Sequence, residues 1–203
     1  MRTRKMMKVL FLAVLLAFGP NLAIAPAVAS VVITDFDNFT SDALYPSWDT
    51  ATIVSGPTSY DITAIGYGSN YKYIGFPVIT GAGNTDIELT VTLEAPQEAD
   101  GHLGPIVGLI DGDGTHHNYA WYGQTLGSHV LTLPIDSPTW VAASGSTLGL
   151  DLDTLTHMHM QLDPGGFGTS GAYTVKWENL SLVPEPATLT LLLVGGLLAR
   201  KRR

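Results

Sequence analysis

The segment Asp86-Ile-Glu-Leu-Thr-Val-Thr-Leu-Glu94 decides the fold class of this chain. Apolar residues alternate with Asp, Glu and Thr, so one set of side chains points to one face of an extended strand and the other set to the opposite face. Such a strand has one face on a hydrophobic core and the other in water. The segment therefore predicts a sheet with a buried inner face and a solvated outer face.

Similar short runs occur throughout residues 30–183, separated by Gly, Pro, Asn and Asp. About ten strands in a segment of this size predict an all-β, antiparallel β-sandwich with at most a short helical turn. In the last strand the apolar alternation slips by one residue after Trp177, which predicts a β-bulge at Glu178-Asn179. The other expected strands are Val31–Phe36, Thr50–Ser55, Tyr60–Gly66, Tyr71–Val78, Ile106–Ile110, Asn118–Tyr122, His129–Ile135, Leu155–Leu162 and Ala172–Val183.

Charge is distributed unevenly along the 203 residues. Residues 30–183 contain 17 acidic side chains against two lysines, Lys72 and Lys176, which is a net charge of −15. Binding to nucleic acid or to anionic lipid requires clustered Lys and Arg, so this composition excludes both kinds of partner. The chain has no cysteine, which excludes disulfides, zinc fingers and a thiolate nucleophile.

Residues 1–29 have the three parts of a secretory signal peptide. Four basic residues precede the apolar run Val9–Phe18, and a small-x-small sequence follows it. We expect Ala27 and Ala29 to enter the signal peptidase pocket and Ser30 to begin the mature chain, because the competing site four residues upstream is followed by proline. The alternative, a permanent signal anchor, needs an apolar run of about 20 residues.

Residues 184–203 contain an acid between two prolines, an apolar run and a basic end. The prolines hold the backbone extended. The apolar run Ala187–Ala199 predicts a short hydrophobic helix that partitions into the membrane, while the basic end stays on the cytoplasmic side. The residues outside this helix are Pro184, Glu185, Pro186, Arg200, Lys201, Arg202 and Arg203.

This tail resembles the PEP-CTERM sorting signal of exported Gram-negative proteins. The resemblance implies that an exosortase-type enzyme recognises Pro184, Glu185 and Pro186 while the helix holds the chain transiently in the inner membrane. It also implies delivery to the cell envelope, the surface or the extracellular matrix. The alternative, an uncleaved anchor helix, changes the attachment but not the compartment.

The sequence TDFDNF at residues 34–39 and YTVKWENLSLV at residues 173–183 frame the domain of residues 30–183. This framing resembles the galactose-binding-like jelly rolls found among carbohydrate-binding modules. The resemblance implies a jelly roll in which a structural calcium ion ties the first strand to the last. Asp35, Asp37 and Glu178 are the expected ligands, since carboxylate oxygens suit calcium.

Two other segments contain residues that can bind metals. The loop Asp111-Gly-Asp-Gly-Thr115 lacks the third acid and the terminal Glu of a calcium loop, and Asp-Gly between apolar runs favours a hairpin turn. In the segment His157-Met-His-Met160 both histidines share one strand face, but no third ligand is nearby in the sequence. We expect these histidines to be exposed, with Met158, Met160 and Leu162 facing the core.

Aromatic residues gather in two segments, one containing Tyr67, Tyr71 and Tyr73 and the other Tyr119, Trp121 and Tyr122. Flat aromatic faces can stack on sugar rings while nearby polar side chains bind hydroxyls. Core packing is the alternative for each of these side chains. The candidates for ligand stacking are Tyr71, Tyr73, Tyr119 and Trp121.

The sequence contains no nucleophile elbow, zinc-protease motif or phosphate loop, so we expect no enzymatic activity. The prediction is an exported, envelope-targeted domain that binds or organises extracellular polysaccharide. Two alternatives stay open: a structural matrix protein without a specific ligand, and a small polysaccharide-degrading enzyme, because acidic residues can always supply a carboxylate pair.

Overall fold

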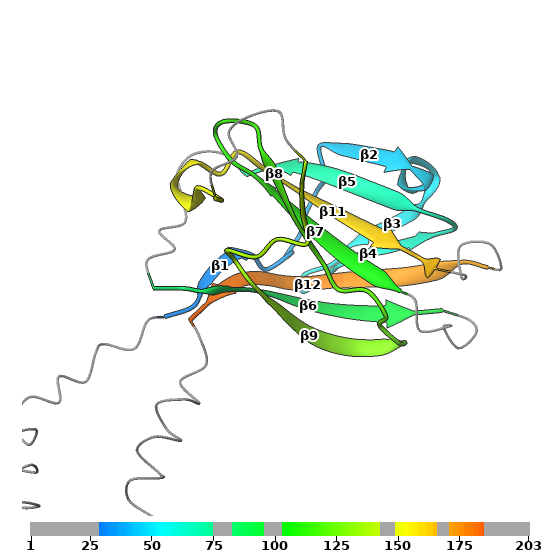
Figure 1. Cartoon of the computed structure of the whole chain (residues 1–203). Coiled ribbons are helices and arrows are strands. Elements are labelled where there is room, and N and C mark those ends of the chain that lie inside the picture. The colour runs from blue at the N-terminus through cyan, green and yellow to red at the C-terminus, as the bar shows by residue number, and fades with distance from the viewer. Residues whose placement is uncertain (1–28, 75–82, 96–102, 143–148, 166–170, 185–203) are drawn as a thin grey trace, which may run out of the picture.

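Two antiparallel sheets pack face to face around one hydrophobic core, as the sequence predicted (Figure 1). The computed structural model describes residues 29–74, 83–95, 103–142, 149–165 and 171–184. In these residues each sheet has six strands. Sheet-on-sheet packing of this kind buries the inner side chains of both sheets and leaves both outer faces free.

The strands of the two sheets are far from sequential in their spatial order. Sheet A contains β3 (Thr52–Ser55), β4 (Tyr60–Ala64), β12 (Tyr173–Val183), β6 (Asp86–Glu94) and β9 (Gly127–Pro134) in this order, and β1 (Val31–Thr34) also pairs with β12. Sheet B contains β10 (Trp140–Ala142), β8 (His116–Ala120), β7 (Gly104–Ile110), β11 (His157–Asp163), β5 (Gly68–Tyr73) and β2 (Ala43–Pro46) in this order. Two short 3-10 helices, η1 (Ser47–Thr50) and η2 (Leu152–Thr154), complete the described elements.

The central strands of sheet A follow the predicted alternation. In β6 every second residue from Ile87 to Leu93 is buried. In β12 the pairing with β6 shifts between Trp177 and Asn179, which confirms the β-bulge. Because of the extra residue, Trp177 and Leu180 both point into the core although they are three positions apart.

Several strand boundaries differ from the prediction. The short edge strands β2 and β10 were missed, because they carry too few residues for a recognisable alternation and are defined by their pairing with β5 and β8. β8 begins at His116, two residues earlier than expected, and β5 begins at Gly68, three residues earlier. Residues 75–78 of the expected strand Tyr71–Val78 lie outside the described residues.

The loop between β7 and β8 is the predicted hairpin turn. The Gly114 N–H donates to the Asp111 carbonyl over 3.0 Å. Gly114 has φ +84°, a left-handed conformation that glycine adopts without steric cost. The loop Asp111–Thr115 thus turns the chain between two strands.

Trp48 of η1 makes a core contact that links the two sheets. The Trp48 Nε1–H donates to the Tyr173 hydroxyl over 2.8 Å, and this hydroxyl donates to the Gly66 carbonyl over 2.6 Å. The Trp48 indole lies directly on β5 at Gly68, where a Cβ would come within 1.9 Å of Trp48 Cδ1. Only glycine allows this close approach.

The described chain begins and ends on neighbouring strands, since β1 pairs antiparallel with β12 (Figure 1). The predicted signal peptide, residues 1–29, and the predicted sorting signal, residues 184–203, fall outside the described residues except for Ala29 and Pro184. Ala27, Glu185, Pro186 and the basic end therefore stay sequence predictions. In the part of the chain that the structure describes, no helix is long and apolar enough to cross a membrane.

The Gly68–Trp48 contact can be tested by overpacking. We expect Gly68→Ala to lower the free energy of unfolding by about 1–3 kcal/mol, because the added methyl group must displace the indole. Gly171→Ala is the matched control, since a Cβ at Gly171 meets no atom within 4 Å and the change should stay within about 0.5 kcal/mol. Urea unfolding of both variants measures the difference. Equal losses would contradict the role of the contact.

Candidate functional site

One side of β11 faces the hydrophobic core, and its other side belongs to the polar outer face of sheet B. Every second residue from Met158 to Leu162 is buried in the core, as predicted. His157, His159 and Gln161 therefore point to the opposite face, because side chains alternate along a strand. One strand thus supplies the core on one side and the candidate site on the other.

Antiparallel pairing places tyrosines beside this row of polar residues. On β5, Tyr73 is opposite His157 and Tyr71 is opposite His159. β2 pairs with the other side of β5 and adds Tyr45. Tyr45 and Tyr73 are each 54% exposed, whereas Tyr71, between them, is partly buried. We call this set the aromatic face; it consists of Tyr45, Tyr71, Tyr73, His157 and Gln161.

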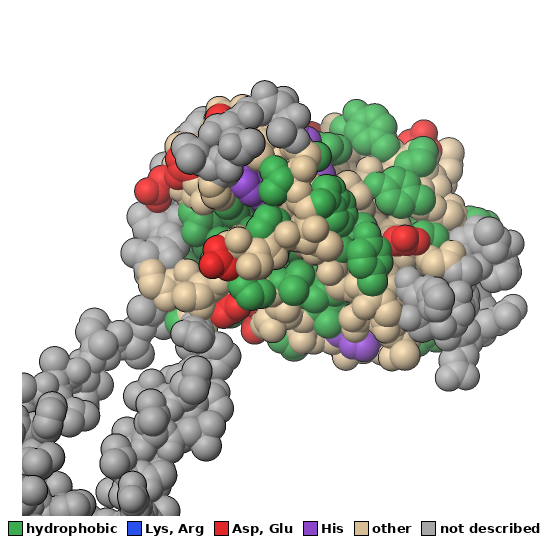
Figure 2. Space-filling model, viewed as in Figure 1, with side chains coloured by type: hydrophobic (Ala, Val, Ile, Leu, Met, Phe, Trp, Pro, Cys, Tyr) green, Lys and Arg blue, Asp and Glu red, His purple; other side chains and the backbone are tan. Residues whose placement is uncertain are grey.

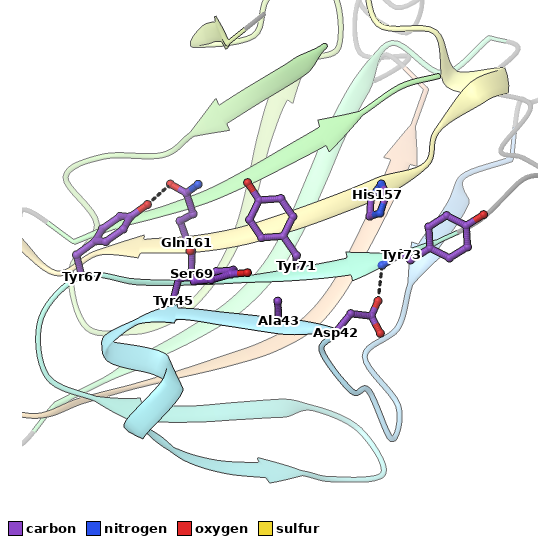
Figure 3. A pocket seen from close by; sticks show the side chains of 9 residues that line it. All are labelled: Asp42, Ala43, Tyr45, Tyr67, Ser69, Tyr71, Tyr73, His157 and Gln161. Carbon is purple, nitrogen blue, oxygen red and sulfur yellow. Dashed lines mark hydrogen bonds between the residues drawn. The ribbon is translucent and has the colours of Figure 1, made fainter. Parts of the chain in front are cut away.

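Two adjoining hollows lie on the aromatic face. Their volumes are about 700 Å³ and about 440 Å³. Both are lined by Tyr71, Tyr73 and His157, so these side chains form their common border. The first hollow is also lined by Asp42, Ala43, Tyr45, Tyr67, Ser69 and Gln161 (Figure 3). The second is also lined by Ile110, Asp111, Gly112, Gly114, His116 and Thr156.

His159 supports the aromatic face from below. It is only 3% exposed, and its Nε2 lies 2.8 Å from Asn118 Oδ1 and 3.2 Å from Gln161 Nε2. The Tyr67 hydroxyl donates to Gln161 Oε1 over 2.6 Å (Figure 3). The Tyr71 ring meets the His159 ring edge-on at a centroid distance of 5.1 Å. The position of Tyr71 therefore depends on the imidazole beneath it.

Gly108 of β7 makes room for this imidazole. A Cβ at Gly108 would lie 1.9 Å from His159 Nε2. His159 is opposite Gly108 in the β11–β7 pair, so any larger side chain would displace the ring outward. The glycine thus allows the histidine to lie flat against the sheet.

Burial fixes the protonation states of the site. Burial and, to a smaller extent, the charge of neighbouring His116 lower the pKa of His159 to about 4, so His159 is neutral at neutral pH. Burial raises the pKa of Tyr71 and of Tyr67, which keeps both hydroxyls protonated. These groups therefore offer neutral donors and acceptors.

Asp42 is the charged group of the first hollow. Its Oδ2 accepts a hydrogen bond from the Tyr73 N–H over 2.6 Å (Figure 3). This bond is the main cause that holds the pKa of Asp42 below its usual value, and Lys72, whose Nζ lies 3.6 Å from Asp42 Oδ1, adds to it. A carboxylate that stays ionised is a strong acceptor for a ligand hydroxyl.

The structure brings together two of the four aromatic residues predicted to stack on a ligand. Tyr71 and Tyr73 lie on the aromatic face. Tyr119 and Trp121 do not: they are 0% and 6% exposed and belong to the core. The Tyr119 hydroxyl donates to the Ile135 carbonyl over 2.6 Å. The register of β8 places Tyr119 inward, so Tyr119 and Trp121 pack in the core, whereas Tyr122 of the same segment is 53% exposed.

The prediction of exposed strand histidines is wrong for His159, which is 3% exposed. His117 is 1% exposed, and its Nε2 lies 3.3 Å from Asp111 Oδ2. His157 and His116 are partly buried. The prediction failed because it assumed a solvated outer face, whereas β5 and its tyrosines cover that side of β11.

The structure does not gather the expected calcium ligands. Asp35 Oδ1 accepts a hydrogen bond from the Asp37 N–H over 3.1 Å, and Glu178 Oε1 accepts one from Thr92 Oγ1 over 3.0 Å. Within the described ranges, no group of three or more His, Asp or Glu side chains could hold a metal ion. Calcium bound by these three residues therefore has no support in the geometry.

Sequence reasoning missed several residues of the site. Tyr45 lies on a strand that was not predicted, and Asp42 directly precedes it. His157 was expected to be merely an exposed strand residue, and Gln161 continues the same row of side chains. The spacing of two residues between His157, His159 and Gln161 was visible in the sequence, but the neighbouring strand that makes the row a site was not.

Comparisons with known proteins show the fold of this chain. No family model matches it, and no curated protein matches it. Among solved structures, the family 11 carbohydrate-binding module from Clostridium thermocellum in complex with a β-1,3-1,4-mixed-linked tetrasaccharide is 18% identical, with a TM-score of 0.52. That match covers 78% of this chain and 97% of the module.

Two enzymes share the same fold over part of their length. An agarase is 11% identical with a TM-score of 0.53, and an exo-β-agarase is 11% identical with a TM-score of 0.50. The matches cover 78% and 75% of this chain but 25% of each agarase chain, so this chain spans about a quarter of their length. The chain is thus an all-β domain with the jelly-roll fold of carbohydrate-binding modules, and the structure matched over nearly its whole length is such a module.

The buried imidazole predicts a pH dependence of stability. Because the pKa of His159 falls from 6.5 when unfolded to about 4 when folded, the unfolded chain binds more protons between these pH values. The free energy of unfolding should therefore decrease as the pH is lowered from 6.5 to 4, by about 3 kcal/mol. Urea unfolding across this range measures the slope.

The matched variant for this prediction is His159→Gln, which removes the titrating group. In this variant the slope of the unfolding free energy against pH should be smaller by the contribution of one bound proton. Asp42, whose pKa is also lowered in the folded protein, contributes to both slopes alike, so the difference between them reports on His159. A slope equal to that of the native chain would mean that another group takes up the proton.

Proposed function

We propose that this protein is an exported, non-catalytic domain that binds extracellular polysaccharide on its aromatic face. The single observation that carries the proposal is the pair of adjoining hollows bordered by Tyr71, Tyr73 and His157. A shallow, elongated surface with aromatic rings and a few polar groups suits a hydroxyl-rich chain. The fold supports the proposal, since the module matched over 97% of its length was solved with a bound tetrasaccharide.

Each part of the aromatic face has a role in this proposal. Tyr45 and Tyr73 present exposed rings at the edge of the sheet, and these rings stack on sugar faces. Tyr71 meets Tyr45 edge-on at 6.2 Å and stands between them as the central contact. Asp42 accepts hydrogen bonds from hydroxyl groups that lie beside the rings, and the Gln161 amide can donate to them (Figure 3).

The two hollows favour a polymer over a single sugar. Because they share a border, a ligand that fills one hollow can continue across Tyr71 and Tyr73 into the other. A second contact region on the same chain raises affinity without any new kind of interaction. Binding should therefore grow with chain length up to the length that spans both hollows.

The geometry also supports a role without catalysis. Glycoside hydrolysis uses a pair of carboxyl groups on either side of the bond that is cleaved. Among the residues that line the first hollow, Asp42 is the one carboxylate. The second hollow contains Asp111, which is 4% exposed and lies beside His117.

Export and sorting complete the proposal. The signal peptide directs the chain through the inner membrane, and the PEP-CTERM-like tail directs it to an exosortase-type enzyme at the envelope of a Gram-negative cell. The last strand, β12, ends at Val183, and Pro184 follows it directly. Processing at Pro184-Glu185-Pro186 can therefore occur without unfolding the sandwich.

Tyr71→Ala tests the binding site. We expect the variant to bind a polysaccharide at least about tenfold more weakly, because a central aromatic contact is typically worth more than about 1.4 kcal/mol. A glycan array with the secreted protein identifies the polymer, and affinity electrophoresis measures the change. Val130→Ala is the control, since Val130 is 65% exposed on the edge strand of sheet A. Equal binding by native protein and Tyr71→Ala would place the site elsewhere.

Glu185→Ala tests the sorting signal. The variant should fold normally and keep its tail, because the substitution lies beyond the last strand and removes the central residue of the motif. Intact-mass analysis of the protein from its native envelope should show that the native chain begins at Ser30 and lacks Arg200–Arg203. Normal processing of the variant would contradict the role of Glu185.

A further inference from the structure

The aromatic face contains no free cation, and the sequence explains why. Residues 30–183 contain no arginine, and Lys72 and Lys176 are the two lysines of the domain. The sequence also shows that segments 75–82, 96–102, 143–148 and 166–170 contain neither Lys nor Arg. Carboxylate and sulfate groups of a ligand are normally bound by guanidinium or ammonium groups.

Lys72 belongs to β5 but points away from the aromatic face. Side chains alternate along the strand, so Lys72 lies on the side opposite to that of Tyr71 and Tyr73. Its Nζ lies 5.6 Å from the centroid of the Phe39 ring and 3.6 Å from Asp42 Oδ1. The ammonium group is thus already paired with the carboxylate of the first hollow.

Lys176 lies on the other sheet. It belongs to β12 in sheet A, and its Nζ lies 2.8 Å from Glu94 Oε1. This ion pair raises the pKa of Lys176, so the lysine stays charged and paired. Neither lysine of the domain is therefore available to an anionic group bound on the aromatic face.

Carboxylates, by contrast, stand around the aromatic face. Asp42 lines the first hollow, Asp111 lines the second, and Asp163 lies at the end of β11 near Tyr67. On the side of the molecule shown in Figure 2, acidic side chains stand among apolar ones, and no Lys or Arg side chain of the described residues is visible. A polymer with its own negative charges would meet these carboxylates, and Lys72, the lysine nearest to the site, is already paired with Asp42.

We infer that the site selects neutral polysaccharides and rejects anionic ones, such as sulfated or uronate-containing chains. This inference rests on the proposed function. Hydroxyl groups of a neutral sugar can donate to Asp42, whereas a sulfate or carboxylate at the same place is repelled. The net charge of −15 on residues 30–183 adds a long-range repulsion that acts before the polymer makes contact. Salt screens this long-range repulsion, but salt does not supply the cationic side chain that an anionic group lacks at the site.

The test uses pairs of polymers that share a backbone and differ in charge. The pairs are hydroxyethyl and carboxymethyl cellulose, methyl-esterified and de-esterified polygalacturonan, and agarose and a sulfated galactan. The secreted protein is run in affinity electrophoresis with each polymer, at low salt and at high salt. For a pair whose neutral member binds, we expect the anionic member to bind at least about tenfold more weakly at both salt concentrations.

The outcomes separate this inference from the proposed function. If the anionic polymer binds as tightly as its neutral partner or more tightly, the inference is overturned. If Tyr71→Ala weakens that binding, the aromatic face is still the site. Binding of the anionic member that recovers fully at high salt would also overturn it, because the selection would then be long-range repulsion alone. If no polymer binds, the proposed function fails and the inference fails with it.

A matched pair of variants tests the local origin of the selection. Asp42→Asn removes one negative charge from the lining of the first hollow and keeps an oxygen acceptor for the Tyr73 N–H. Glu88→Gln removes one charge from the outer side of β6 in the other sheet, where Glu88 is paired with Thr132 and Ser181. We expect the neutral-to-anionic affinity ratio to narrow more in Asp42→Asn than in Glu88→Gln. Equal ratios in the two variants would overturn the inference.

Discussion

The alternation of side chains along β11 is the constraint on which the rest of the site depends. Residues 158, 160 and 162 fill the core, so residues 157, 159 and 161 must stand on the outer face. Moving the register of β11 by one residue would turn the imidazoles toward the core and the methionines toward the outer face. The core therefore holds the site in place, because any change in the packing of Met158 or Met160 would reach His159 and Tyr71 through the same strand.

The imidazole of His159 connects the sheet to the aromatic face. It lies on Gly108, contacts Asn118 and Gln161, and meets the edge of the Tyr71 ring. A buried polar side chain is costly unless it has hydrogen-bonding partners, and residues of four strands, β5, β7, β8 and β11, surround this imidazole. His159 is therefore a positioning residue, whereas the rings and polar groups above it would contact a ligand.

The sheet order explains why the site combines residues from distant parts of the chain. β2, β5 and β11 are neighbours in sheet B, although β11 follows β5 by more than 80 residues. Asp42 and Tyr73 are joined by a hydrogen bond across 31 positions, and Tyr67 and Gln161 by one across 94. The same arrangement pairs Lys72 with Asp42 and places Lys176 on the other sheet. The chemistry of the site is thus neutral and acidic.

The sequence by itself determined the fold class. The alternation in Asp86–Glu94 and the slip after Trp177 depend only on which residues face the core, and both agree with the structure. The sequence also determined that an anionic ligand has almost no cation to meet, since charge is a property of composition. Only the tertiary structure decided which aromatic residues are available. Tyr71 and Tyr119 both lie on strands, but the pairing of each strand decides which side faces the other sheet, and that pairing joins segments that no local pattern connects.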